Sequence, residues 1–233
     1  MGKSPAVALL SGGMDSAVVL AHALREGFAV HAISFDYGQR HKVELDLASR
    51  LASSLGATSH QQIALDHTAF QGSALTDDID VPKDRPMDET IPVTYVPARN
   101  LVFLAMATAY AESISARDIF IGVNAIDYSG YPDCRKVFIE SFQQTANLAT
   151  RVGVESKTPA ICVHTPLLEL SKAQIVEKGI ALGIDFAMTL SCYDPRVKGD
   201  SVEVCGHCDA CILRAAGFAE AGVVDGGIGE RVF

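Results

Sequence analysis

The segment from 10 to 16 offers the most distinctive chemistry in this sequence, and it follows the short apolar run Ala6–Leu10. Its two glycines lack a Cβ, so the backbone can turn sharply and bring its N–H groups close to an anion. The helix expected next adds the positive end of its dipole, and two serine hydroxyls add further donors. We therefore predict a pyrophosphate-binding loop. Its residues are Leu10, Ser11, Gly12, Gly13, Met14, Asp15 and Ser16.

The same segment also suggests which bond of a nucleotide is broken. It contains no lysine, so it does not match the G-x-x-x-x-G-K-[ST] phosphate loop. It resembles the PP-loop of ATP pyrophosphatases, which cleave ATP between the α and β phosphates and activate a substrate oxygen as an adenylate. Asp15 can cap the helix or help to hold a Mg²⁺ ion that bridges phosphates. The alternative is a Gly-Gly turn that only joins a strand to a helix.

Four of the six cysteines lie in the last quarter of the chain, in a spacing typical of a metal site. Four thiolates can surround one ion tetrahedrally, and Zn²⁺ is the expected occupant of a closed thiolate site. Such a site leaves no open position for water, so we expect one structural Zn²⁺ ion per chain. An iron–sulfur cluster and unligated thiols are the alternatives. The predicted ligands are Cys192, Cys205, Cys208 and Cys211.

Length and composition fit one α/β domain with a modest appendage. The chain has 233 residues, of which 48% are hydrophobic and 20% charged, as in ordinary globular enzymes. A net charge of −9 argues against a nucleic-acid partner and requires local positive groups wherever ATP binds. Apolar runs are too short for a membrane span, and no export signal precedes the first strand. We expect a cytoplasmic protein with reduced cysteines.

Apolar strand-like runs alternate with helix-like stretches, which predicts βαβ units and a parallel sheet. We predict an α/β fold with an open, mostly parallel sheet, helices on both faces, and a small C-terminal zinc-binding segment. The expected division is a nucleotide-binding domain over 1–187 and a zinc-binding segment with a helix over 188–233. Strands are expected at 6–10, 29–35, 59–65, 118–123 and 160–164, and helices at 15–26, 43–55, 100–111, 135–148 and 172–182.

A long connection from 66 to 97 has little periodicity and many aspartates and prolines. Long loops in compact domains are usually lids, binding loops or linkers. We interpret this one as a mobile segment near the site, with a solvated linker as the alternative. The turn at 36–41 follows a predicted strand, where ligands of open sheets bind, or it is a capped, solvated turn.

Several segments together resemble one family. They are Y-V-P-A-R-N at 95–100, G-V-N-A-I-D-Y-S-G-Y-P-D-C-R at 122–135, S-K at 171–172, S-C-Y at 191–193 and C-G-H-C-D-A-C at 205–211. The set is similar to the 7-cyano-7-deazaguanine synthases, which are PP-loop ligases of the queuosine precursor pathway. The resemblance runs from about residue 6 to about residue 222, and its 127–135 run is more specific than the PP-loop alone.

The resemblance implies an ATP-dependent ligase. The carboxylate of 7-carboxy-7-deazaguanine would attack the α-phosphate, pyrophosphate would leave, and ammonia would displace AMP to give an amide. Adenylation of the amide oxygen and loss of AMP would then yield the nitrile. The implied partners are therefore small molecules, with a homodimer expected by analogy with the fold. Neither nucleic acid nor membrane is expected.

Individual roles also follow from the resemblance. Lys172 stands at a helix start, where PP-loop relatives place a phosphate-binding lysine; the alternative is a solvated surface lysine. Arg99 would meet a phosphate or the substrate carboxylate, or form a structural salt bridge. Together they are the predicted catalytic residues. The predicted substrate-binding residues are Asp127, Tyr128, Tyr131 and Asp133. The alternative is that this segment is a turn that binds no ligand.

One position departs from the family pattern, because Ala98 stands where V-P-G-R-N has glycine. If that position requires a positive φ, the alanine carries strain.

Two rival functions stay open at the level of sequence. One is a PP-loop enzyme that adenylates a base of tRNA, which would need a basic groove. The other is a zinc-stapled nucleotide sensor that binds ATP without catalysis.

Overall fold

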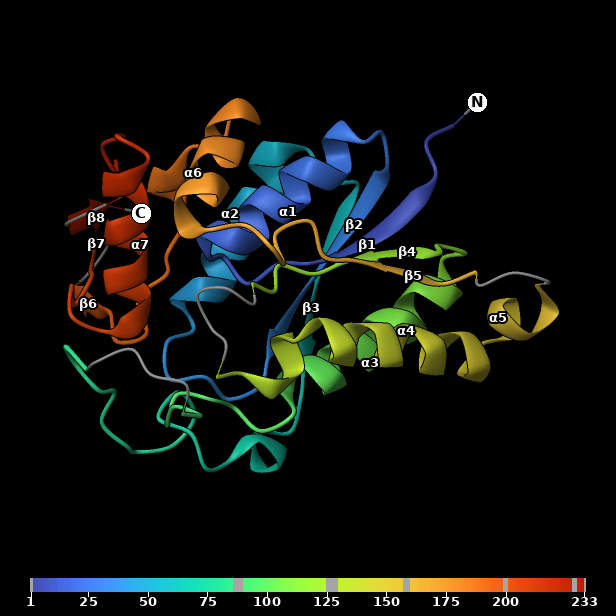
Figure 1. Cartoon of the computed structure of the whole chain (residues 1–233), viewed down its shortest axis with the longest axis horizontal. Helices are drawn as coiled ribbons and strands as arrows, with labels where there is room; N and C mark the ends of the chain where they lie inside the picture. Colours follow the sequence, from blue (N-terminus) through green and yellow to red (C-terminus); the bar gives the residue numbers. More distant parts are fainter. Residues whose placement is uncertain are drawn as a thin grey trace.

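The computed structural model describes residues 2–85, 90–124, 130–156, 160–198 and 201–227, together with the backbone of 230–232. Its centre is a parallel sheet of five strands in the order β3-β2-β1-β4-β5 (Figure 1). The order reverses at β1, which pairs with β2 on one side and β4 on the other. The strands are β1 (Pro5–Leu9), β2 (Ala29–Asp36), β3 (Ser59–Ala64), β4 (Asp118–Phe120) and β5 (Cys162–His164).

Helices cover both faces of this sheet (Figure 1). Ala6 and Ala8 of β1 pack into one core with α1, α2 and α6, whereas Val7 and Leu9 pack into a second core with α3 and α4. Successive side chains of a strand point to opposite faces, so a doubly covered strand reads as an unbroken apolar run. The helices are α1 (Met14–Arg25), α2 (Val43–Leu55), α3 (Arg99–Ser113), α4 (Lys136–Ala149), α5 (Arg151–Glu155), α6 (Lys172–Ala181) and α7 (Asp209–Glu220).

The predicted fold class is confirmed, and most predicted elements lie within two residues of the observed ones. The helix predicted at 43–55 matches α2, and Gly56 caps it in the left-handed region at φ 83°. β4 and β5 are shorter than predicted, with three residues each. Among the helices of the described residues, none is long and apolar enough to cross a membrane.

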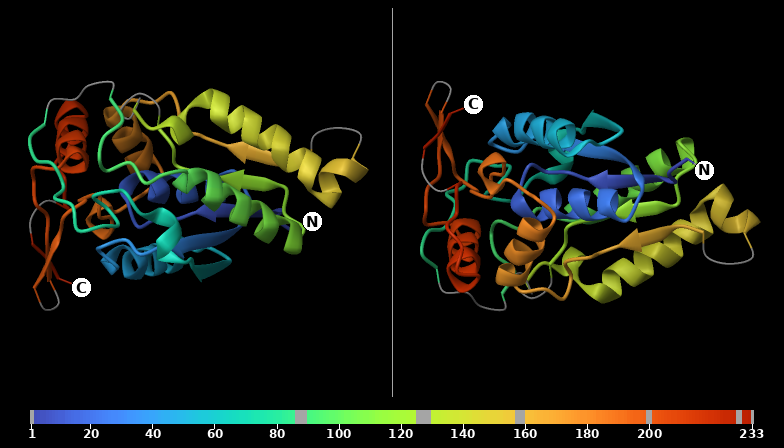
Figure 2. Two further views of the ribbon diagram at one scale, coloured as in Figure 1. Left: turned by 90° about the horizontal axis from the view of Figure 1, so that it is seen from below. Right: turned by 90° about the horizontal axis from the view of Figure 1, so that it is seen from above.

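The C-terminal segment forms a small unit at one end of the molecule, opposite α5 (Figure 2). It holds a three-stranded antiparallel sheet that the sequence analysis did not predict. Its strands are three residues long and β6 is exposed, so each is too short for its alternation to identify a strand from the sequence. They are β6 (Arg196–Lys198), β7 (Ser201–Glu203) and β8 (Glu230–Val232). Outside this unit, the described residues include the short 3₁₀ helices η1 (His67–Phe70), η2 (Pro132–Cys134) and η3 (Phe186–Met188).

A buried arginine joins α7 to the chain that precedes the cysteines. Arg214 donates two hydrogen bonds to the Asp225 carboxylate, at 2.6 and 2.8 Å. Its remaining N–H groups donate to the carbonyl oxygen of Phe186 and to the hydroxyl of Thr189, both at 2.9 Å. Because the guanidinium and the carboxylate are both buried, losing either one would leave an unpaired charge in the interior.

The left-handed conformation suspected at Ala98 is present, with φ 53° and ψ 23°. Ala98 caps the N-terminus of α3, and its N–H donates to the Tyr95 hydroxyl at 2.9 Å. An alanine in this region costs about 1 kcal/mol because its Cβ crowds the following carbonyl. The helix therefore begins from a strained residue.

We predict that Ala98→Gly stabilises the protein by about 1 kcal/mol and raises Tm by about 2–4 °C, because glycine adopts this conformation without strain. Differential scanning calorimetry measures the shift. Ala105→Gly, at an exposed site of the same helix, is the matched control and should lower Tm. Equal losses in both variants would contradict the proposed strain.

Candidate active site

A pocket of about 260 Å³ lies at the carboxyl ends of β1, β2 and β4. In open parallel sheets this edge, beside the point where strand order reverses, is where ligands bind. The walls come from segments far apart in the sequence. They include Ser11, Gly13, Asp15, Ser16, Tyr37, His41, Glu44, Arg99, Asn100, Asn124, Tyr131, Lys172, Ser191 and Tyr193.

The predicted glycine loop forms the floor of this pocket. Gly12 has φ 86°, and a Cβ at this position would lie 2.5 Å from the carbonyl oxygen of Glu44. Only glycine fits both the dihedral angle and the close approach of α2. The Gly12 carbonyl also accepts a hydrogen bond from the N–H of Leu190 at 2.9 Å. The loop is thus held between α2 and the chain that leads to the cysteines.

The two serines of the loop organise the start of α1. The Ser16 hydroxyl donates to the Gly13 carbonyl at 2.9 Å and accepts from the Ser11 N–H at 3.1 Å. The Ser11 hydroxyl accepts from the Gly13 N–H at 3.3 Å. Gly13 caps α1, whose N-terminus lines the pocket together with these hydroxyls. Such an arrangement of N–H groups and a helix dipole favours an anion.

Lys172 joins the loop in the same pocket, as the family resemblance implied. It is the first residue of α6, and its Nζ lies 2.9 and 3.1 Å from the two carboxylate oxygens of Asp15. Its side chain is only 8% exposed. A Cβ on Gly217 of α7 would lie 2.5 Å from the Lys172 Cγ, so α7 packs directly along the lysine stem. The alternative interpretation of Lys172, as a solvated surface lysine, is therefore excluded.

Arg99 lies on another wall of the pocket. Its Nη1 donates to the Tyr37 hydroxyl at 3.3 Å, and its guanidinium lies 5.9 Å from the centre of the same ring. Glu44, in the first turn of α2, also lines the pocket. Burial raises the pKa of the Glu44 carboxyl to about 7, and the positive charge of Arg99 opposes this rise.

The predicted substrate-binding residues have different surroundings. Tyr131 lines the pocket, and its hydroxyl is 2.9 Å from that of Thr94. Asp133 is buried, and its carboxylate accepts a hydrogen bond from the N–H of Asn100 at 2.9 Å, near the start of α3. This contact gives Asp133 a part in positioning α3 and Arg99. Asp127 and Tyr128 lie outside the described residues.

The four cysteines come together as the spacing predicted. The sulfur atoms of Cys192, Cys205, Cys208 and Cys211 all lie within 4.8 Å of one another. Tetrahedral zinc with Zn–S bonds of 2.3 Å would place sulfur atoms about 3.8 Å apart, and Cys205 and Cys211 are separated by 4.0 Å. Backbone N–H groups donate to these sulfurs, for example from Cys205 to Cys192 at 3.2 Å. The cluster therefore fits a metal ion.

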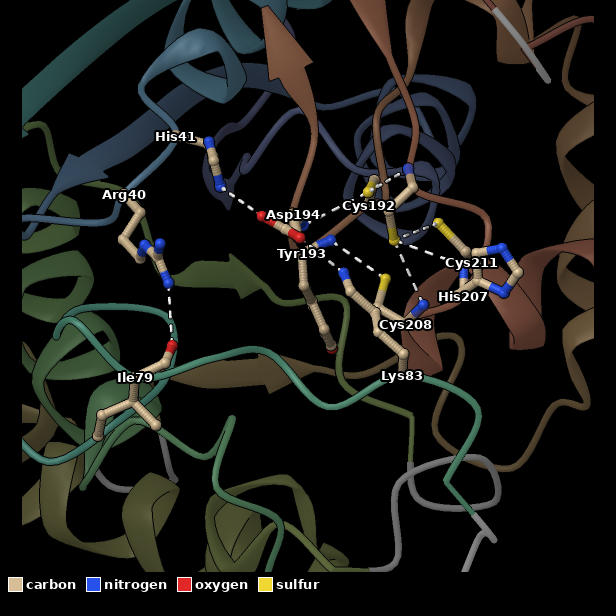
Figure 3. Close-up of polar contacts among 11 residues, drawn as sticks. Arg40, His41, Ile79, Lys83, Cys192, Tyr193, Asp194, His207, Cys208 and Cys211 are labelled. Carbon is tan, nitrogen blue, oxygen red and sulfur yellow. Dashed lines mark hydrogen bonds and ion pairs between the residues drawn. The ribbon is translucent and has the colours of Figure 1, made fainter.

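The long connection contacts this cysteine segment at three consecutive residues. Lys83 Nζ lies 2.7 Å from Asp194 Oδ2, as Figure 3 shows. The N–H of Asp84 donates to the His207 carbonyl at 2.9 Å, and its carboxylate faces the His207 ring. Arg85 Nε lies 2.7 Å from the buried Asp209 carboxylate.

The same connection also reaches the turn after β2. Arg40 donates from Nη1 to the Ile79 carbonyl at 2.9 Å (Figure 3), and Leu75 lines the pocket. The expected position near the site is thus observed. Mobility of this segment stays a prediction.

Three features of the site were not found from the sequence. Glu44 and Leu75 line the pocket, and the cysteine segment supplies a wall through Ser191 and Tyr193. A carboxylate in the first turn of a helix after a strand end was a usable signal for Glu44. Leu75 sits in an aperiodic stretch with no such signal. The turn at 36–41, in contrast, was a predicted candidate and does line the pocket through Tyr37 and His41.

The glycine loop, the parallel sheet and the pocket at its switch point define a PP-loop class of nucleotide-binding α/β protein. The fold is similar to that of a Methanocaldococcus jannaschii protein described as a predicted subunit of tRNA methyltransferase. The TM-score is 0.50 at 19% sequence identity, over 98% of this chain and 96% of the other. That similarity concerns the fold alone.

Sequence comparison gives the family. Residues 5–222 match the profile described as queuosine biosynthesis protein QueC, and the chain belongs to this family. A relative from Desulfatibacillum aliphaticivorans is 58% identical over 96% of this chain and 95% of its own length. Another from Methylococcus capsulatus is 60% identical, covering 95% and 96%. Both relatives are named 7-cyano-7-deazaguanine synthase.

We predict that Cys208→Ser loses the metal ion of the four-cysteine centre, because its sulfur is buried within the cluster. Metal analysis of the purified variant measures the loss. Limited proteolysis should then cut first between 192 and 227. Cys134→Ala, which removes a buried thiol outside the cluster, is the control and should retain the ion. Unchanged metal content in Cys208→Ser would refute the assignment of this ligand.

Proposed function

We propose that this chain is an ATP-dependent ligase that converts 7-carboxy-7-deazaguanine and ammonia into 7-cyano-7-deazaguanine, with release of AMP and pyrophosphate. The main support is the convergence of the glycine loop, Lys172 and Arg99 on one pocket. The named activity of relatives that are 58–60% identical supports the choice of substrate.

The reaction needs an activated carboxylate, because hydroxide is a poor leaving group and AMP is a good one. We assign the leaving pyrophosphate to the glycine loop and the N-terminus of α1. The ammonium group of Lys172 would donate to phosphate oxygens, and the Arg99 guanidinium would meet a phosphate or the substrate carboxylate. These groups also supply the local positive charge that a chain of net charge −9 requires.

We assign two metals to this scheme. The four thiolates would hold one structural Zn²⁺ ion, which fixes the cysteine segment against the pocket. Asp15 offers a carboxylate beside the loop, suited to the Mg²⁺ ion that accompanies ATP phosphates. We also propose that 188–233 is a distinct zinc-binding segment attached to a nucleotide-binding domain at 1–187.

The deazaguanine ring requires donors, acceptors and a stacking surface. We assign these to Tyr131 at the pocket wall, and to Tyr128, Asp127 and Asp133. The Asp133 carboxylate also accepts a hydrogen bond from the Asn100 N–H at the start of α3. All the partners in this scheme are small molecules.

We also propose a homodimer in the cytoplasm. Val137 and Leu148 of α4 and Val154 of α5 are 69–81% exposed, which is consistent with an apolar contact between copies. None of the six cysteines forms a disulfide, as in a reducing compartment.

The two rival functions and the synthase predict different results for tRNA binding, pyrophosphate release and nitrile formation. A tRNA-adenylating enzyme would bind tRNA tightly and salt-sensitively. A nucleotide sensor would bind ATP without releasing pyrophosphate. The synthase is the only one that should form the nitrile from ATP, ammonium and 7-carboxy-7-deazaguanine, which mass spectrometry detects directly.

We predict that Lys172→Ala lowers kcat roughly 10²-fold or more, because a charged donor to the transition state is lost. Product formation is followed by mass spectrometry and pyrophosphate release. Lys136→Ala, at an exposed lysine 3.5 Å from Glu169, is the control and should retain activity. Thermal unfolding of both variants separates a catalytic loss from misfolding. A fully active Lys172→Ala would contradict the assigned role.

We further propose that Glu44 accepts a proton from the nitrogen nucleophile, because this residue lines the pocket and burial raises the pKa of its carboxyl to about 7. Activity should then rise as the pH increases through about 7, as Glu44 loses its proton. In Glu44→Gln the part of this rise that comes from Glu44 should disappear, which leaves only the increase in free ammonia. The ratio of the two activities at each pH removes the effect of free ammonia, which changes equally in both. A constant ratio from about pH 6 to about pH 8 would refute the role.

The same substitution gives a second measurement, on stability. The folded-state pKa of Glu44 lies above its ordinary value of 4.5, so ionisation opposes folding as the pH rises. Glu44→Gln should therefore raise Tm at about pH 8 and have little effect near pH 4.5, where the carboxyl is largely protonated in the folded protein.

A further inference from the structure

A second cluster of metal-binding side chains lies away from the pocket, on β4 and β5. It consists of Asp118, Cys162 and His164. The parallel register pairs Asp118 with Cys162, and alternate residues of a strand point to the same face. The three side chains therefore lie on the face that carries α1 and α6. Among the described residues, those that line the pocket do not include these three.

The distances suit a single small cation. One donor atom from each residue can be chosen so that all three lie within 4.8 Å of one another. His164 Nδ1 is 3.9 Å from Cys162 Sγ, and His164 Nε2 is 2.7 Å from Asp118 Oδ1. Around tetrahedral zinc, nitrogen and sulfur ligands lie about 3.6 Å apart and nitrogen and oxygen ligands about 3.3 Å apart. The two contacts use different nitrogens of the ring and one ion binds only one of them, so binding requires side-chain movement within the set of donor atoms that lies within 4.8 Å.

The histidine ring is held in place, and the site can be reached from outside. The ring of Phe120 stacks on that of His164, with centroids 4.4 Å apart and planes 14° apart. β5 is an edge strand of the sheet. The side chains of His164 and Asp118 are 33% and 26% exposed, so an ion and a water molecule can enter.

The neighbouring charges permit a cation. On α1, His22 has a pKa lowered by burial and by the charge of Lys178, so it is neutral near pH 8 and adds no repulsion. Lys178 of α6 is the nearby positive charge, and its Nζ lies 3.5 Å from the carbonyl of Pro166. A thiolate with a carboxylate outweighs the charge of Lys178 once His164 has given up its proton to the incoming ion.

We propose that Asp118, Cys162 and His164 form a second metal site, selective for a borderline divalent cation such as Zn²⁺. A thiolate with an imidazole favours Zn²⁺ and Co²⁺ over Mg²⁺ and Ca²⁺. Three protein ligands leave a fourth position for water, unlike the four-thiolate centre. The ion would link the two strands at this edge of the sheet. The proposal stands apart from the ligase function, so either can fail alone.

The test counts metal ions in the full-length protein. With the four-cysteine centre filled by zinc, Co²⁺ is titrated at about pH 8 in the presence of a non-coordinating phosphine reductant. We expect one additional equivalent of Co²⁺, with a thiolate-to-cobalt charge-transfer band and the visible bands of tetrahedral Co²⁺. Asp118 and Cys162 raise the pKa of His164 to about 9, so cobalt must displace a proton and the working pH is kept high.

Matched variants test which residues bind the additional Co²⁺ ion. Cys162→Ser should lose the added Co²⁺ and keep the first zinc, whereas Cys134→Ala should keep both. Asp118→Asn should weaken Co²⁺ binding at least tenfold, whether the carboxylate binds the ion or orients His164. Absence of a second equivalent in the unsubstituted protein, or its persistence in Cys162→Ser, would overturn the proposal. Thermal unfolding with and without Co²⁺ checks that each variant is folded.

Discussion

The site depends on one partly buried ion pair, between Lys172 of α6 and Asp15 of the glycine loop. An ammonium group that is nearly removed from water needs a charged partner, and Asp15 provides it. The pair ties the start of α1 to the start of α6, while the absence of a side chain on Gly217 lets α7 pack against the lysine stem. The groups that we propose to bind phosphate, in the glycine loop and at the start of α6, are held in one place as a result.

The cysteine segment contributes to the pocket as well as to stability. Its cysteine cluster contacts the backbone at Tyr193, which lines the pocket, because the Tyr193 N–H donates to Cys208 Sγ at 3.4 Å. The hydrogen bonds from Leu190 to the Gly12 carbonyl and from Arg214 to the Phe186 carbonyl hold the same segment against the rest of the chain. Ion pairs from residues 83–85 then connect the long loop to it. The cysteine cluster and one wall of the pocket are thereby physically linked.

Local rules explain which predictions were confirmed. Val43–Leu55 is amphipathic and ends at a glycine, so α2 follows from its own sequence. The cysteine spacing predicted a cluster because two residues between cysteines already place their sulfurs close together. β6 and β7 escaped prediction because three-residue strands gain their order from their pairing partners rather than from their own pattern. Glu44 differs, because its place in the first turn of a helix after a strand was a usable signal, and only its burial depends on the tertiary structure.

The sequence alone determined the α/β class, the glycine loop and the cysteine cluster, because each shows in a local pattern of residue types: alternating apolar runs, a Gly-Gly turn and closely spaced cysteines. The tertiary structure decided which charged groups meet. Lys172 and Asp15 are 157 positions apart, and Asp118 and His164 are 46 apart. Their partners depend on how strands are ordered and registered, and on burial that changes the cost of a charge. Neither quantity can be read from residues taken in sequence order.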